Sequence, residues 1–64
     1  MSAKRFTLMG YGETLSWPTI KGVDTGEPAA VIAAARQFLD DAPLCDRIEI
    51  WSGSELIHTV RRAA

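Results

Sequence analysis

The chain has 64 residues, of which 47% are apolar and 23% charged, and its formal net charge is −1. This length predicts one domain over residues 1–64, near the lower size limit for folding without a disulfide or a metal. The near-neutral charge argues against a dedicated nucleic-acid or membrane-surface binder, because such proteins carry an excess of Lys and Arg. No segment approaches the roughly 20 apolar residues of a membrane span.

Cys45 is the only cysteine, which excludes an intramolecular disulfide. Cys45 and His58 together supply too few ligands for a structural zinc, so we expect neither a metal nor another cofactor. The basic residues Lys4 and Arg5 are not followed by the apolar stretch of a secretory signal. The lone cysteine and the missing signal predict a cytoplasmic protein. Self-association is then the simplest source of additional stability.

The first half of the chain reads as a β-hairpin. A strand is predicted from Lys4 to Met9, where apolar and polar residues alternate. A turn is predicted at Gly10–Glu13, because two close glycines permit positive φ angles. Extended structure resumes at Thr14–Trp17. Pro18 cannot donate a ladder hydrogen bond, so it places this strand at an edge or breaks it, and Thr19–Val23 continues it irregularly.

A helix follows. Asp24 and Glu27 resemble a capping box in which Asp replaces Ser or Thr, and Pro28 suits the first helical turn. Apolar residues recur at helical spacing over residues 27–42. Pro43 ends the helix.

Two further strands are predicted at Asp46–Trp51 and Glu55–Arg61, with a turn at Ser52 and Gly53. The element order is therefore ββαββ. We predict an α+β fold, in which one helix packs on one face of a four-stranded antiparallel sheet. Strand order 2-1-3-4 is preferred, because it makes every pairing antiparallel. Order 1-2-3-4 requires a parallel crossover through the helix and is the alternative.

The register of the second hairpin depends on Gly53. If Gly53 takes the left-handed position of a three-residue loop, Leu56 and Val60 face the helix. Ile57 and Thr59 then point away. The predicted core comprises the apolar residues that this arrangement places between sheet and helix: Phe6, Leu8, Leu15, Val31, Ala35, Phe38, Leu39, Ile48, Ile50, Leu56 and Val60.

His58 and Cys45 are the candidates for catalysis. His58 could serve as a general base or a pH switch, but no acid or nucleophile stands at a recognisable spacing from it. Glu49 could lie opposite His58 as an ordinary cross-strand pair. Cys45 follows the helix C-terminus and adjoins Asp46, a setting that disfavours a reactive thiolate and favours a packing role. An enzyme that uses Cys45 and His58 is the least favoured function.

Asp40, Asp41 and Asp46 form an acidic cluster. The cluster lacks the number and spacing of oxygen ligands of a cation-binding loop. The predicted topology brings three arginines to the same pole of the domain, namely Arg47, Arg61 and Arg62. We therefore expect a solvated network of salt bridges there.

The segment from Ala33 to Leu39, followed by Ile48–Gly53 and by Leu56 and Ile57, resembles short uncharacterised bacterial proteins. In those proteins a helix precedes a strand, a W-x-G turn and a second strand. The resemblance covers the C-terminal half of the chain. It implies a bacterial origin and the fold of that half, and it supplies no activity and no functional residue.

A single helix covers only one face of a sheet, so apolar residues on the second face or the rim remain without partners. These residues are Met9, Trp17, Trp51 and Ile57, and we predict that they form an interaction surface. The favoured function is a non-enzymatic protein–protein interaction module that forms a symmetric homodimer or binds another protein. The alternative is a small nucleic-acid-binding or regulatory protein. It would use exposed aromatic residues with two basic pairs, Lys4 and Arg5, and Arg61 and Arg62.

Overall fold

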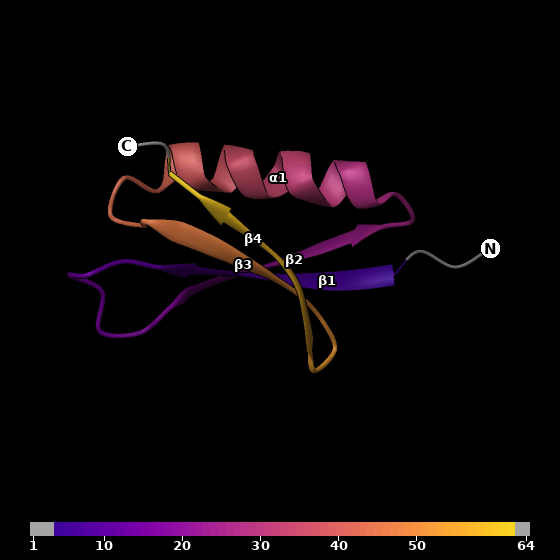
Figure 1. Cartoon of the computed structure of the whole chain (residues 1–64), viewed down its shortest axis with the longest axis horizontal. Coiled ribbons are helices and arrows are strands. Elements are labelled where there is room, and N and C mark those ends of the chain that lie inside the picture. Colours follow the sequence, from indigo (N-terminus) through magenta and orange to yellow (C-terminus); the bar gives the residue numbers. More distant parts are fainter. Residues whose placement is uncertain (1–3, 63–64) are drawn as a thin grey trace.

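The computed structural model describes residues 4–62, and residues 1–3 and 63–64 lie outside the described part. The elements follow the order β1 (Lys4–Tyr11), β2 (Thr19–Thr25), α1 (Pro28–Asp41), β3 (Arg47–Ser52) and β4 (Glu55–Arg61). The strands form one sheet of order β2-β1-β3-β4 in which every pairing is antiparallel. The helix α1 lies across one face of this sheet (Figure 1). The predicted α+β fold and the preferred strand order are confirmed.

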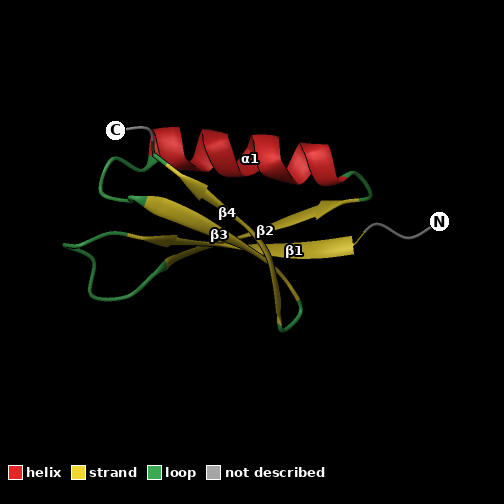
Figure 2. Ribbon diagram, in the orientation of Figure 1, coloured by secondary structure: helices red, strands yellow, loops and turns green. Residues whose placement is uncertain are grey.

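The core lies between α1 and the sheet (Figure 2). Alternate residues of β1 and β3 and one residue of β4 are buried beneath the helix, which contributes a stripe of its own. The buried residues are Phe6, Leu8, Val31, Ala35, Leu39, Cys45, Ile48, Ile50 and Val60. The predicted core members Leu15 and Phe38 are partly buried and pack against this cluster. The burial of Cys45 agrees with the packing role that its sequence context favours.

The strand β1 is longer than predicted, because Gly10 within it and Gly12 just after it serve packing rather than a turn. Gly10 is a buried residue of β1, and a Cβ atom on it would lie 2.7 Å from the Sγ atom of Cys45. A Cβ atom on Gly12 would overlap the carbonyl oxygen of Leu44. The two glycines therefore let the connection between α1 and β3 lie against the end of β1. The turn predicted at Gly10–Glu13 is wrong for Gly10 and Tyr11.

The strand β2 begins later than predicted. Residues Thr14–Trp17, predicted as a strand, belong to the loop between β1 and β2. In the register of the two strands Gly10 pairs with Thr19, so the residues between them form a wide connection. The regular strand is Thr19–Thr25, which the sequence pattern had suggested only as an irregular continuation.

The helix begins at Pro28, as predicted, but Asp24 does not cap it. Asp24 lies within β2, and its carboxylate accepts hydrogen bonds from Arg5. The N-cap residue is Glu27, and its side chain makes no capping hydrogen bond to the first turn of the helix. Its backbone N–H donates instead to Oγ1 of Thr25 over 3.1 Å. The capping-box prediction is therefore wrong, because the strand extends through the position that a capping residue would need.

The helix ends at Asp41, two residues before Pro43, and Arg62 closes its C-terminus. The Nη2 atom of Arg62 donates to the carbonyl oxygens of Leu39 over 2.8 Å and Ala42 over 3.1 Å. The Nε atom donates to the carbonyl oxygen of Cys45 over 3.2 Å. The carbonyl oxygens of Leu39 and Ala42 also accept backbone N–H groups, of Ala42 and Cys45 respectively. The guanidinium therefore adds charged donors to carbonyls at the helix C-terminus, where the negative end of the helix dipole favours a cation.

The predicted salt-bridge network at this pole does not form. Within residues 4–62, the ion pairs are Arg5 with Asp24 and Arg47 with Glu49. Asp41 accepts a hydrogen bond from Gln37, one helical turn earlier. Of the three arginines expected near the aspartates, Arg47 pairs with Glu49, Arg62 binds backbone carbonyls, and Arg61 makes no ion pair within residues 4–62.

A β-bulge sets the register of the second hairpin. Ser52 pairs with Glu55, so the loop has two residues, Gly53 and Ser54, and the three-residue loop considered for this turn is wrong. Gly53 has a φ of +61°, which agrees with the left-handed position considered for it. The register then shifts, because Ile50 pairs with His58 whereas Trp51 pairs with Leu56. Ile57 is the extra residue of this bulge.

The bulge overturns the predicted orientation of two side chains. Leu56 lies opposite Trp51, away from the helix, and is 45% exposed, so its assignment to the core is wrong. Ile57 lines a groove on the helix side together with Phe6 and Val31, so it does not point away from α1. Val60 and Thr59 have the predicted orientations, since Val60 is buried and Thr59 pairs with Glu49.

Candidate functional site

The face of the sheet opposite α1, called the open face here, is the main candidate site. Phe6, Leu8 and Gly10 of β1 are buried under the helix, so the alternate residues Thr7, Met9 and Tyr11 lie on the open face. Residues that pair across strands share a face, which assigns the neighbouring positions. The open face also carries Ile20, Gly22 and Asp24 of β2, Arg47, Glu49 and Trp51 of β3, and Leu56, Thr59 and Arg61 of β4.

An apolar band crosses the open face from one edge strand to the other. It consists of Ile20, Met9, Trp51 and Leu56, one residue from each strand, and is called the open-face band below. Ile20 pairs with Met9, and Trp51 pairs with Leu56. The two edge residues are the more exposed, Ile20 at 63% and Leu56 at 45%, while Met9 and Trp51 are half-buried. Met9 and Trp51 occupy diagonal positions on β1 and β3, because Met9 pairs with Glu49 and Trp51 with Thr7. The band therefore presents one apolar side chain from each strand on an oblique line across the sheet.

Polar contacts hold the centre of the open face in one arrangement. The indole Nε1 of Trp51 donates to Glu49 over 3.1 Å, and Nε of Arg47 lies 3.5 Å from the same carboxylate. The guanidinium carbon of Arg47 lies 4.5 Å from the ring centroid of Tyr11. The Tyr11 hydroxyl donates to the sulfur of Met9 over 3.8 Å. Because these side chains are already ordered, a partner would lose little conformational freedom on binding there.

One corner of the open face carries a bidentate ion pair between Arg5 and Asp24. The Nε and Nη2 atoms of Arg5 donate to the two carboxylate oxygens of Asp24 over 2.9 and 3.1 Å. The hydrogen bond to Arg5 lowers the pKa of Asp24, and the same bond raises the pKa of Arg5. Both side chains remain exposed, so the pair adds little to stability but can meet a partner.

The structure places two of the four predicted surface residues together. Met9 and Trp51 lie on the open face. Trp17 is 78% exposed in the loop between β1 and β2, which projects from the end of the sheet (Figure 1). Ile57 lies on the helix side, next to His58. The predicted interaction surface is therefore divided among three regions of the molecule.

Ile20 and Leu56 are the open-face residues that the sequence reasoning missed. A strand starting directly after Pro18 would have placed Ile20 opposite Met9, and proline commonly precedes the first residue of a strand. Leu56 has no such signal, because the bulge that exposes it leaves no mark in the apolar pattern.

The two candidate catalytic residues do not form a pair. Cys45 is buried against Gly10 and Ile48. His58 lies opposite Ile50 and is exposed at the rim of the helix-side groove. The predicted pairing of His58 with Glu49 is wrong, since Glu49 pairs with Thr59 on the other face.

The two basic pairs lie at opposite ends of the sheet. Lys4 and Arg5 begin β1, whereas Arg61 pairs with Arg47, which in turn lies opposite the last residue of β1. Arg5 is bound to Asp24 and Arg62 to backbone carbonyls. The pairs therefore do not join into one basic surface.

Within residues 4–62, no three His, Cys, Asp or Glu side chains gather closely enough to hold a metal ion. No helix of this part of the chain combines the length and the hydropathy that a membrane span requires. No known protein family, curated protein or solved structure matches the chain.

Proposed function

We propose that this chain is a non-enzymatic protein–protein interaction module that self-associates through its open face as a symmetric homodimer. The observation that carries the proposal is the open-face band, with Ile20 63% exposed on a sheet whose other face is covered by α1. An apolar strip of this kind on a monomer usually marks a partner surface. A chain this small also gains proportionally more from burying further apolar area.

The layout of the open face suits a second copy of itself. The band runs obliquely from Ile20 on β2 to Leu56 on β4, between two corners that carry charge. One corner has Arg5 and Asp24, and the other has Arg61. A two-fold axis along the band would superpose the band on its own copy, and it would bring the corner with Arg5 and Asp24 of each protomer over the corner with Arg47 and Arg61 of the other. Both apolar and charged groups then find complementary partners, as an isologous interface requires.

The arginine corner supports this orientation. Arg47 and Arg61 are directly opposite each other on adjacent strands, and like charges so placed repel. Arg47 has Glu49 as a partner, whereas Arg61 makes no ion pair within residues 4–62. A carboxylate from a second protomer would relieve this repulsion, and Asp24 is the exposed acid at the matching corner.

Sedimentation equilibrium at micromolar concentration tests the proposal. The unmodified chain is expected to be dimeric, and Ile20→Lys to raise the dimer dissociation constant at least about tenfold, because it places a charge within the apolar band that the second protomer would cover. Leu44→Lys is the matched control, since Leu44 is 62% exposed but lies in the connection between α1 and β3. An unmodified chain that is monomeric throughout this range, or equal weakening by both variants, would contradict the proposal.

The alternatives have less support. Arg5 and Arg62 are engaged within the chain, and the basic pairs lie apart, which disfavours nucleic-acid binding. Salt-dependent binding of a single-stranded oligonucleotide that Arg61→Gln abolishes would favour this alternative. An enzyme has no support from the separate places of Cys45 and His58. We further propose a cytoplasmic location, which the free thiol of Cys45 supports because such thiols persist in a reducing compartment.

A further inference from the structure

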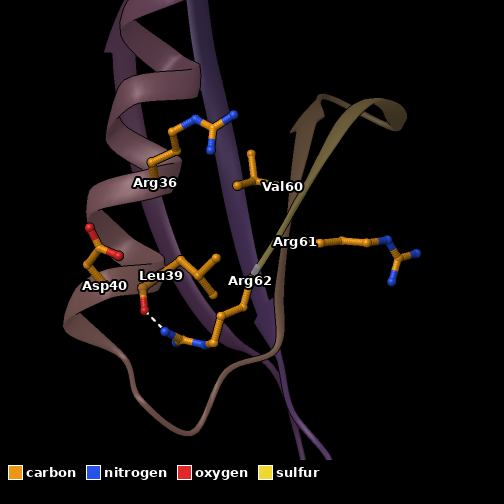
Figure 3. Close-up of a pocket in the computed structure, with 6 residues that line it drawn as sticks. All are labelled: Arg36, Leu39, Asp40, Val60, Arg61 and Arg62. Carbon is orange, nitrogen blue, oxygen red and sulfur yellow. Dashed lines mark hydrogen bonds between the residues drawn. The ribbon is translucent and has the colours of Figure 1, made fainter. Parts of the chain in front are cut away.

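A hollow of about 300 Å³ lies between the C-terminal half of α1 and the end of β4, and of the open-face residues only Arg61 borders it. It is lined by Arg36, Leu39 and Asp40 from the helix and by Val60, Arg61 and Arg62 from the other wall (Figure 3). Leu39 and Val60 are buried core residues, so the hollow has an apolar floor.

The charges around the hollow are unbalanced. Three arginines and one aspartate line it, although the whole chain has a net charge of −1. In Figure 3 the side chain of Arg61 points away from the hollow, and Arg36 extends over it toward Val60. Asp40, one turn after Arg36, makes no ion pair with it, since the ion pairs within residues 4–62 lie elsewhere. Arg36 and Arg62 therefore flank the hollow without a carboxylate partner in this part of the chain.

Arg62 is held in a fixed position beside the hollow. Its Nε and Nη2 atoms donate to the carbonyl oxygens of Leu39, Ala42 and Cys45. Its Nη1 atom makes no hydrogen bond to any of residues 4–62, so two N–H donors remain for another acceptor. A guanidinium already fixed by its neighbours loses little entropy when it binds an anion.

We propose that this hollow binds a small organic carboxylate. Figure 3 shows the head of Arg36 beside Val60 and that of Arg62 at the Leu39 carbonyl, so the exposed Arg36 side chain turns toward the fixed Arg62 when the ligand binds. Both guanidinium groups then donate to the carboxylate, because a planar guanidinium matches its two oxygens. The apolar body of the ligand lies over Leu39 and Val60. A bare inorganic anion would find the arginines but would gain nothing from the floor, which selects an organic acid over phosphate.

A benzoate titration monitored by the NMR chemical shifts of the backbone amides tests this site. The titration is run at about 0.15 M salt, because salt at that level screens the exposed charges elsewhere. Benzoate is expected to shift the amides of the lining residues saturably. Benzylamine, which has the opposite charge on a similar body, should leave them unmoved, and inorganic phosphate should bind at least about tenfold more weakly. The titration is repeated on the Ile20→Lys variant, so that its result does not depend on dimerisation.

Two variants make the test specific. Arg36→Gln is expected to weaken benzoate binding at least about tenfold, because it removes one charged hydrogen-bonding partner. Lys4→Gln removes an equal charge at the other end of the sheet, outside the hollow, and should change the affinity less than about twofold. Both residues are exposed, so both variants should fold. A linear, unsaturable benzoate response, equal losses in the two variants, or phosphate binding as tight as benzoate would overturn the proposal.

Discussion

The two faces of the sheet differ in how their side chains are satisfied. Under α1, residues such as Leu8 and Ile48 are fully buried and packed against apolar neighbours. On the open face the same strands carry an apolar band bordered by ion pairs and by an indole hydrogen bond. One face is therefore complete within the monomer. The other is ordered but leaves apolar groups in contact with water, and this difference directs our proposal to the open face.

The difference also separates stability from association. Residues under the helix should determine whether the chain folds, because their apolar area is removed from water within one protomer. Residues of the open-face band should determine whether two chains associate. Substitutions on the two faces of one strand can therefore test the distinction directly.

The largest expected effect is at Leu8. Leu8→Ala should destabilise the fold by about 2–5 kcal/mol, because it removes buried methyl groups and leaves a cavity under α1. Met9→Ala, on the neighbouring residue of the opposite face, should cost the monomer less than about 1.5 kcal/mol. Urea unfolding of the dilute, monomeric protein measures both free energies. Equal losses would mean that the open face is a second core.

The next effect concerns the attachment of the helix to its face. Arg62→Ala should destabilise the protein by about 1.5–3 kcal/mol, because charged hydrogen bonds to three backbone carbonyls are lost. Arg61→Ala, with no side-chain hydrogen bond within residues 4–62, should change stability by less than about 0.5 kcal/mol. Thermal unfolding of the two variants decides the point. If Arg62→Ala left the stability unchanged, water would satisfy these carbonyls as well as the guanidinium does.

The second half of the chain was the easier to predict. The helical spacing of apolar residues predicted α1, and Pro28 and Pro43 indicated where it begins and ends. The strand β4 has the predicted bounds Glu55–Arg61. What failed there was the register, because a bulge adds one residue without altering composition or alternation. Leu56 and Ile57 are both apolar, so the sequence offers no way to tell which of them the bulge turns outward.

The first half misled the prediction because glycine has two common uses. Gly10 and Gly12 were interpreted as turn residues, although neither has a positive φ and both lie where a side chain would collide with the α1–β3 connection. That requirement is tertiary and invisible in local sequence. The error moved β2 and thereby concealed Ile20, whereas the open face itself followed correctly from one helix on one sheet.

A smaller effect distinguishes two glycines. Gly53→Ala should destabilise the hairpin by about 1–2 kcal/mol, because alanine disfavours the φ of +61°. Gly22 of β2 lies on the open face with free space around it and no positive φ, so Gly22→Ala should be neutral or stabilise by up to about 1 kcal/mol. Denaturation midpoints of the two variants provide the comparison. A loss at Gly22 similar to that at Gly53 would contradict the assignment of Gly53 to the conformationally demanding position.

The smallest effect is at the charged corner of the open face. Arg5 lowers the pKa of Asp24 from its ordinary 3.8, so the unfolded chain binds more protons than the folded one between the two values. The contribution of the pair is therefore complete above pH 3.8 and is lost as the pH falls through the lowered pKa. Because both side chains are exposed, the contribution is small and weakens with salt.

Asp24→Asn should lower the urea midpoint slightly at neutral pH and leave it equal to that of the unmodified chain at a pH below both pKa values. Arg5→Gln should produce a similar loss at neutral pH, and the double variant should lose little more, since either change already breaks the pair. A difference that persists in acid, or additive losses in the double variant, would show that Asp24 acts through something other than Arg5. In that case Arg5 and Asp24 would not act as an ion pair in solution. The proposed contact between this corner and the arginine corner of a second protomer would then lose its support.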